Sequence, residues 1–385
     1  MEAVVESRPN GISTSENLLA TSALPKIPSA TRQEFTPKLS TESVLFVPGA
    51  SGDFGSRLCE ALGAKAGKLV LSKFSNSETR IEIHESVRDR HVFVAATIAN
   101  PVNDSFMETV LLVQALKLAD ARRITVILPC FPYARQDRKA DTRPPISAKA
   151  VTDILKVMGA HQIVTVDLHA TQVEGFFDGP FENLSGLNQL VRPVITEEGS
   201  DLVVVSPDAG GAKRAENFAR QIEKISGEFA PLLVMSKFRP GPAAQPIVTL
   251  SAGTDTIAGK TCVLIDDMID TGGSIIAAAC ALKDKGAARV IVCATHAVFS
   301  GNATERLASA RTSSGERAID CVYVTDTLPQ SERNSDFVRT VSITPLIAEA
   351  IARLDQPMGT LRDLKERTDL GTPLYRAHER EALLH

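Results

Sequence analysis

Short apolar runs of strand length alternate with longer segments of helical period along the chain from Ser43 onward. Leu202–Ser206 is typical, because its four consecutive apolar residues predict a strand that is buried on both faces. Buried strands that alternate with helices indicate α/β units with parallel, helix-covered sheets. Strands are predicted over residues 44–47, 68–73, 92–96, 124–129, 163–167, 202–206, 232–236, 262–266, 290–295 and 321–325. Helices are predicted over residues 106–118, 146–158, 211–222, 274–285 and 345–354.

These strands are more numerous than one open sheet usually carries, so we expect two similar α/β domains. The boundary is placed near Asn183, after the turn-rich segment Phe177–Pro180. The start of the chain is rich in Ser, Thr and Pro and has no helical or strand period, which predicts disorder. In chain order we expect a disordered extension, an N-terminal domain, a C-terminal domain and a tail, over residues 1–40, 41–183, 184–356 and 357–385.

The composition narrows the class of protein. The 385 residues are 43% hydrophobic and 23% charged, as in globular proteins, and the net charge of −4 gives no bulk attraction to nucleic acid or anionic lipid. No apolar run approaches the ~20 residues that span a bilayer, and the six cysteines stand singly, as reduced thiols do. We therefore expect a cytoplasmic protein with no membrane or nucleic-acid partner. Organellar targeting by residues 1–40 stays open, although acids such as Glu2 and Glu6 argue against it.

The segment Val263–Ser274 (VLIDDMIDTGGS) carries the strongest chemical signal. An apolar strand ends in two carboxylates, and a Thr-Gly-Gly-Ser turn opens the next helix, where backbone N–H groups and hydroxyls can bind a phosphate. Carboxylates at the carboxyl end of such a strand can accept hydrogen bonds from sugar hydroxyls or help to bind a cation. The polar residues would also suit a simple helix cap, but the complete run favours a sugar-phosphate site. We assign to it Asp266, Asp267, Asp270, Thr271, Gly272, Gly273 and Ser274.

Other polar residues follow predicted strands in the same way. His169 and Asp208 come shortly after two of them, and an imidazole with a carboxylate can bind Mg²⁺ sparsely, although a lone histidine at a strand end is more often structural. Lys237 and Arg239 stand one residue apart, which places both cations on one side of an extended strand. Such a pair is ordinarily an inert part of the surface.

The segment Val263–Ser274 resembles the ribose-phosphate signature that phosphoribosyltransferases share with ribose-phosphate pyrophosphokinases. Several further motifs are similar to the pyrophosphokinase family and occur in family order, at residues 74–79, 84–88, 129–137, 145–149, 167–172, 175–178 and 206–211. The resemblance runs from about Val44 to about Leu354. It implies two similar α/β domains of phosphoribosyltransferase type. It also implies transfer of the diphosphoryl group of Mg-ATP to the anomeric hydroxyl of ribose 5-phosphate, with release of AMP.

The resemblance also implies residue roles. His169 and Asp208 match residues that position the Mg²⁺ of Mg-ATP, and Arg135 and Gln136 match ATP contacts in a loop that folds over the nucleotide. The residues Phe74, Asn76 and Glu78 match a motif that reaches the adenine from a neighbouring subunit, so a homo-oligomer with a shared ATP site is expected. Lys237 and Arg239 match a mobile catalytic loop, where cations stabilise the charge of the transferred group, and Arg239 is also assigned to the ribose phosphate.

The chain departs from the family in its regulatory positions. Ser86, Arg88, Lys139 and Arg143 match a phosphate site, but Gly359–Leu361 lacks the closely spaced serine pair of many members. We therefore expect weak or absent activation by phosphate. Two smaller departures are Ser77, which replaces a common Gln, and a slightly longer loop between residues 239 and 261.

Two other functions stay open beside the active pyrophosphokinase. A non-catalytic regulatory relative would lack motif residues that are present here, and a phosphoribosyltransferase would need neither the Arg135–Gln136 loop nor the motif at residues 74–79. A kinase of the P-loop class is excluded, because the chain has no GxxxxGK[ST] motif.

Overall fold

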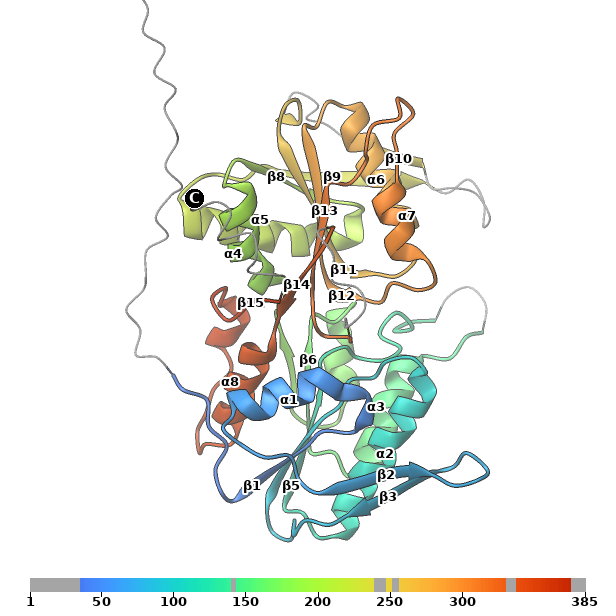
Figure 1. Ribbon diagram of the computed structural model, residues 1–385, viewed down its shortest axis with the longest axis vertical. Coiled ribbons are helices and arrows are strands. Elements are labelled where there is room, and N and C mark those ends of the chain that lie inside the picture. Colours follow the sequence, from blue (N-terminus) through green and yellow to red (C-terminus); the bar gives the residue numbers. More distant parts are fainter. Residues whose placement is uncertain (1–34, 140–142, 239–246, 251–255, 330–336, 375–385) are drawn as a thin grey trace, which may run out of the picture.

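The computed structural model describes residues 35–139, 143–238, 247–250, 256–329 and 337–374. Two parallel sheets, each covered by helices, lie one above the other in Figure 1. This confirms the predicted α/β class with two helix-covered, mainly parallel sheets. No helix in the described part of the chain is long and apolar enough to cross a membrane.

The N-terminal sheet has five parallel strands in the order β1-β4-β5-β6-β7. Every residue of β4 is buried, and alternate residues face different helices: Val92 and Val94 lie in the cluster with α2 and α3, whereas Phe93 lies in the cluster with α1. The five strands are Ser43–Phe46, His91–Ala95, Arg123–Leu128, Gln162–Val166 and Phe181–Leu184. The helices α1, α2 and α3 span Gly52–Ala61, Val102–Leu118 and Ser147–Met158.

The C-terminal sheet has eight strands in the order β10-β9-β8-β11-β12-β13-β14-β15, of which β10 and β15 are antiparallel edges. Helices α4 and α5 cover one face, and α6 and α7 cover the other. The strands β8 to β15 span Leu202–Ser206, Leu232–Phe238, Ile247–Leu250, Thr261–Ile269, Arg289–Ala297, Cys321–Thr325, Val338–Ser342 and Thr372–Pro373. The helices α4 to α7 span Leu187–Glu198, Ala212–Ser226, Gly273–Asp284 and Ala303–Ser309.

The last long helix, α8 (Thr344–Leu354), crosses back to the N-terminal sheet and lies beside α1 (Figure 1). Its buried residues Leu346 and Ile347 share one apolar cluster with Phe54 and Leu58 of α1. The predicted C-terminal domain, residues 184–356, therefore contains a helix that packs in the N-terminal half. The predicted boundary near Asn183 falls inside β7, which pairs with β6.

The predicted extension and tail both include residues that pack on the domains. Of residues 1–40, the first 34 lie outside the described residues, but Leu39 is buried and its N–H bonds to the carbonyl of Leu62. In the tail, Leu364 is buried, and β15 pairs with β14 of the C-terminal sheet. Residues 375–385 lie outside the described residues.

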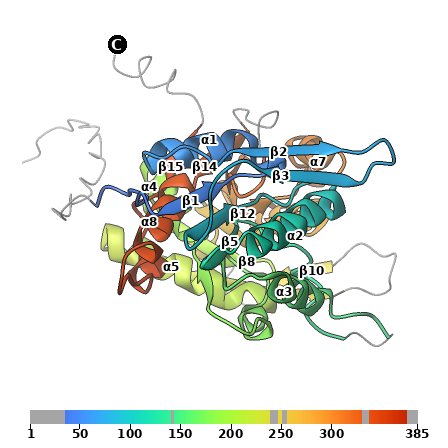
Figure 2. The same cartoon turned by 90° about the horizontal axis from the view of Figure 1, so that it is seen from below.

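The hairpin of β2 (Leu69–Lys73) and β3 (Thr79–Ile83) forms a separate antiparallel pair. It projects to one side of the N-terminal domain beyond α2, as Figures 1 and 2 both show. Ser77 at its tip has a left-handed backbone with φ of 69°. The hairpin thus carries the motif of residues 74–79 on an exposed arm.

Candidate active site

The paired carboxylates lie on β11, the strand beside β8 and β12 in the C-terminal sheet. The strand continues to Ile269, so Asp266 and Asp267 lie inside the strand, near its carboxyl end, and not after it. Asp267 is 2% exposed, and a buried carboxylate needs a charged or hydrogen-bonded partner. The two carboxylates therefore belong to a central strand and lie near the carboxyl end of the sheet.

Asp267 receives its partners from both halves of the molecule. His169 of the N-terminal half donates Nδ1–H to Asp267 Oδ2 at 2.8 Å, and Arg214 of α5 lies 3.3 Å from Oδ1. Burial alone would raise the pKa of Asp267, but the hydrogen bond from His169 and the charge of Arg214 hold it below its usual range. Burial and the neighbouring Asp267 raise the pKa of Asp266. The hydrogen bond with Asp267 raises the pKa of His169.

The turn after β11 has the geometry of an anion site. Gly272 has φ of 76°, a left-handed conformation, and α6 begins at Gly273, so its unpaired N–H groups face the turn. A Cβ on Gly272 would lie 3.0 Å from Leu307 Cδ2, so only glycine fits without displacement. Arg306 of α7 donates to the carbonyl of Thr271 at 3.0 Å and places a cation beside the turn.

Asp270 joins the sugar-phosphate turn to the predicted nucleotide loop. Its Oδ2 lies 2.6 Å from Arg135 Nη1, which comes from the other domain. Hydrogen bonds from Ser300 and then Arg135 lower the pKa of Asp270. Two residues predicted to serve different substrates are therefore neighbours across the domain boundary.

A cavity of about 660 Å³ lies at the same boundary, a size typical of small-ligand sites. Arg135 and Gln136 line it from the N-terminal domain, and Met268 and Phe299 line it from the C-terminal domain. Arg135 lines it and Asp270 does not, so the cavity lies beside the Arg135–Asp270 pair.

His169 and Asp208 are the predicted Mg²⁺ pair. His169 follows β6 and Asp208 follows β8, and the described contacts do not join them directly. Asp208 follows β8 and accepts the N–H of Gly211 at 3.2 Å through Oδ1. In the described part of the chain, no three His, Cys, Asp or Glu side chains converge closely enough to hold a metal ion by themselves. The donors present, carboxylates and one imidazole, suit Mg²⁺ that keeps most of its positions for water and substrate oxygens.

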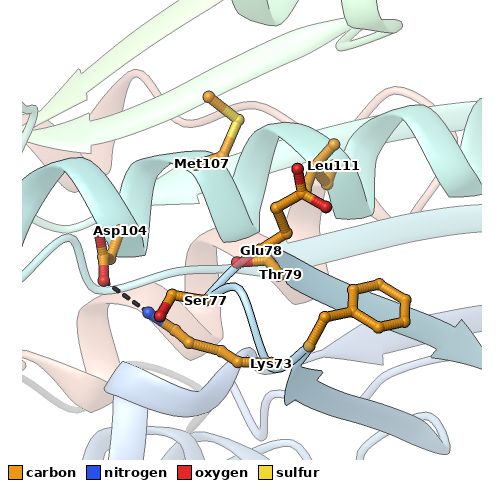
Figure 3. Close-up of a pocket in the computed structure, with 8 residues that line it drawn as sticks. Lys73, Ser77, Glu78, Thr79, Asp104, Met107 and Leu111 are labelled. Atoms are coloured by element: carbon orange, nitrogen blue, oxygen red, sulfur yellow. Dashed lines mark hydrogen bonds and ion pairs between the residues drawn. The ribbon is translucent and has the colours of Figure 1, made fainter.

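The hairpin residues Phe74, Asn76 and Glu78 lie at a second place. A cavity of about 390 Å³ lies between the hairpin and α2, lined by Phe74, Glu78 and Met107 among others (Figure 3). Lys73 is paired with Asp104 at 2.6 Å, as the dashed line in Figure 3 marks. The two cavities share no lining residue, so among the described residues the hairpin motif and Arg135 line separate cavities.

The remaining predicted residues are placed in part. Lys237 lies in β9 opposite Val248 of β10, and Arg239 lies outside the described residues. For the regulatory positions, the described contacts join none of Ser86, Arg88, Lys139 and Arg143 to one another. Arg88 has a 79% exposed side chain and lies 3.9 Å from Asp120.

Sequence reasoning missed two cations of this site, Arg214 and Arg306. Arg214 lies in the first turn of α5, where the helix dipole disfavours a positive charge unless acids are near. The arginine in Gly-Gly-Ala-Lys-Arg, at the start of a predicted helix, could therefore have indicated that acidic groups lie nearby. Arg306 gave no such signal, because its contact with Thr271 depends on how α7 packs.

Comparison with known proteins places this geometry in a family. Residues 43–159 match the model of the N-terminal domain of ribose phosphate pyrophosphokinase, and residues 239–361 match the phosphoribosyl synthetase-associated domain. The ribose-phosphate pyrophosphokinase of Clostridium acetobutylicum is 38% identical over 325 residues, which cover 84% of this chain and 97% of that protein. The chain belongs to the ribose-phosphate pyrophosphokinase family.

Two more relatives extend the likeness to most of the fold. The ribose-phosphate pyrophosphokinase of Bacillus caldolyticus is 40% identical over 312 residues, 80% of this chain and 94% of that protein. The crystal structure of phosphoribosylpyrophosphate synthetase from Mycobacterium smegmatis has a TM-score of 0.73 and 38% identity, covering 81% of this chain and 98% of that one. This member of the family is therefore an enzyme with the family's two-domain fold.

Proposed function

We propose that the protein transfers the diphosphoryl group of Mg-ATP to the anomeric hydroxyl of ribose 5-phosphate, giving 5-phosphoribosyl 1-diphosphate and AMP. The observation that carries the proposal is the 2.6 Å contact between Arg135 and Asp270. It brings the nucleotide loop and the sugar-phosphate turn to one point, as a reaction between two bound substrates requires. We propose that this reaction takes place in the cytoplasm.

The sugar phosphate is assigned to the turn after β11. The N–H groups at the start of α6, with Thr271 and Ser274, would bind the 5-phosphate, since a helix N-terminus favours an anion. Asp266, Asp267 and Asp270 would accept hydrogen bonds from ribose hydroxyls.

The nucleotide is assigned to the cavity at the domain boundary, which adjoins the sugar-phosphate turn through the contact between Arg135 and Asp270. Arg135 and Gln136 would bind ATP, and Arg135 would exchange its partner Asp270 for the polyphosphate. His169 and Asp208 would help to hold Mg²⁺, which neutralises the polyphosphate and the charge that develops on it during transfer. His169 can use only Nε2 for this purpose, because its Nδ1 is bonded to Asp267.

The cations Lys237 and Arg239 are assigned to the transferred group. In-line attack on the β-phosphorus spreads negative charge over that group, and fixed cations stabilise it. Lys237→Ala is therefore expected to lower kcat by a factor on the order of 10²–10⁴ with little change in KM. A loss confined to KM would show that Lys237 only binds substrate.

The reaction is tested by supplying purified protein with Mg-ATP, with and without ribose 5-phosphate. AMP and 5-phosphoribosyl 1-diphosphate should form only when the sugar phosphate and Mg²⁺ are both present. Sugar-dependent formation of ADP would contradict the proposal. A non-catalytic relative would release neither nucleotide.

The active form is proposed to be a homo-oligomer whose ATP site takes Phe74, Asn76 and Glu78 from a neighbouring subunit. The separate cavities support this, because in the described part of the chain none of the predicted ATP residues Arg135, Gln136 and His169 lines the cavity of the hairpin motif. Phe74 is 51% exposed, and Arg80 stacks on it at 5.8 Å.

Mixing two inactive variants tests this sharing. Phe74→Ala removes the ring that a neighbour receives, and Lys237→Ala inactivates the subunit that receives it. Random mixed oligomers should recover about a quarter of wild-type activity, because one site in four then joins two intact halves. No recovery after mixing and refolding together would place both functions in a single chain.

A further inference from the structure

The turn that carries His169 has an unusual start. Asp167 follows β6 directly and has φ of 39°, in the left-handed region. Outside glycine this conformation is strained, and Asp adopts it when its side chain finds local hydrogen-bond partners. The position of His169, two residues later, therefore depends on what holds Asp167.

The partners of Asp167 come from the C-terminal half of the molecule. Its Oδ2 accepts Thr295 Oγ1–H at 2.5 Å and the N–H of Leu187 at 2.7 Å. Its backbone carbonyl lies 3.1 Å from His296 Nε2. Thr295 and His296 are 0% and 2% exposed in β12, and Asp167 is half-buried, so the C-terminal side of these contacts is shielded from water.

A second layer fixes the donors themselves. A carbonyl oxygen only accepts, so His296 Nε2 carries the proton, and its Nδ1 lies 2.9 Å from Thr327 Oγ1. The carbonyl of Thr295 accepts the hydroxyl of Thr325 at 2.7 Å. The donors of this small group each have a defined partner, which favours one arrangement.

The same turn meets the C-terminal sheet a second time through His169, which bonds to Asp267 on β11. The register of β11 and β12 pairs Asp266 with Ala294 and Met268 with His296, so the two attachments lie side by side on neighbouring strands. The turn is therefore bonded to the C-terminal sheet at two points, through Asp167 to β12 and through His169 to β11.

We propose that Thr295 and His296 are positioning residues for His169, set the direction of its imidazole, and thereby tune the site for the Mg²⁺-bound nucleotide. The proposal rests on the role proposed above for His169. Neither residue is proposed to contact a substrate, because both act through the backbone carbonyl and the carboxylate of Asp167.

The test compares two buried threonines. Thr295→Val removes the hydroxyl that bonds to Asp167 and keeps the volume. Thr165→Val is the matched control, because Thr165 is also fully buried in a central strand and donates to the carbonyl of Leu128 at 2.6 Å, within the N-terminal domain. Both should lose similar stability in urea unfolding.

Binding is measured by calorimetry with the Mg²⁺ complex of α,β-methylene-ATP, whose α–β bond cannot be cleaved, and activity by the two KM values. For Thr295→Val we expect about tenfold weaker binding of the analogue and a matching rise in KM for Mg-ATP, with KM for ribose 5-phosphate within about twofold. Thr165→Val should bind as wild type, and Thr295→Ser should restore binding.

Equal behaviour of Thr295→Val and Thr165→Val, or equal rises in both KM values, would overturn the proposal. If Thr295→Val does not fold, Thr295→Cys keeps a weak donor and should show a smaller loss in the same direction. Wild-type protein that binds the analogue but yields no AMP would instead count against the proposed function alone.

Discussion

The turns after β6 and β11 serve one site but are built in different ways. The turn after β11 relies on its own residues, with Gly272 in the left-handed region and α6 starting at the next residue. The turn after β6 has no glycine, and Asp167 takes the left-handed conformation with support from β12. A glycine turn is thus specified locally, whereas an aspartate turn depends on residues more than a hundred positions away.

The largest effect is expected from the functional side chain of the supported turn. His169→Ala should lower kcat/KM for Mg-ATP about a hundredfold, since a charge-assisted interaction is worth roughly 1.5–3 kcal/mol. The variant also loses the hydrogen bond to the buried Asp267, so the free energy of unfolding should fall as well, although Arg214 still pairs with that carboxylate. His84→Ala, at another partly exposed histidine outside the site, is the control, and steady-state kinetics with urea unfolding decide the matter. An equal loss in the control would remove the special role of this turn.

The glycine turn should be broken by a single methyl group. Gly272→Ala is expected to cost about 1–2 kcal/mol of unfolding free energy, because φ is 76° and Leu307 lies 3.0 Å from the added Cβ. Gly259→Ala is matched, with φ of 74° and no atom within 4 Å of its Cβ. The difference between the two variants measures the close packing of the turn, and KM for ribose 5-phosphate should rise only for Gly272→Ala. Identical results would show that backbone strain alone matters there.

The smallest effect is expected at Asp270, which already has partners in the free enzyme. Asp270→Ala should raise KM for ribose 5-phosphate about five- to tenfold and KM for ATP much less, because the contact with Arg135 offsets part of the loss. Initial rates with each substrate varied in turn give both values. Equal weakening of both substrates would point to a folding defect or to a wrong assignment of the turn.

Activation by phosphate is expected to distinguish this chain from relatives with the serine pair. Each missing hydroxyl removes about 0.5–1.5 kcal/mol, so we expect activation that is several-fold weaker in affinity or absent. Gly359 has no room for a side chain, because a Cβ there would lie 1.7 Å from the carbonyl oxygen of Arg353. A phosphate titration of activity that shows tight, strong activation would mean that other residues rebuild the site.

The central strands were predictable because burial on both faces leaves an unbroken apolar run in the sequence. β8 and β13 have the predicted bounds, Leu202–Ser206 and Cys321–Thr325. β3 was not predicted, although Ile81 and Ile83 alternate with polar residues, because the prediction relied on continuous apolar runs. β7 was not predicted, because Glu182 and Asn183 interrupt its apolar run. Helices α1, α4 and α7 were also missed, and α4 contains Pro193, which disguises its helical pattern.

The residues of the candidate site also differ in how far the sequence could predict them. A local motif predicted Asp266–Ser274, because it contains its own chemistry at a strand end, whereas His169 was predicted mainly from the resemblance to the family. Arg214, Thr295 and His296 were not identified, since their importance comes from contacts between residues far apart in sequence. Periodicity predicted α8 but could not show which of the two sheets it covers.

The return of α8 to the N-terminal sheet has a consequence for synthesis. The cluster that contains Phe54, Leu58 and Phe93 is completed by Leu346 and Ile347. This face of the N-terminal sheet is therefore not fully covered until α8 has been synthesised. About 160 residues separate β7 from α8, and at 5–20 residues per second the ribosome needs roughly 8–32 seconds to make them. During that interval the nascent chain presents an apolar sheet face to its surroundings, and a chaperone that binds such faces has its opportunity then.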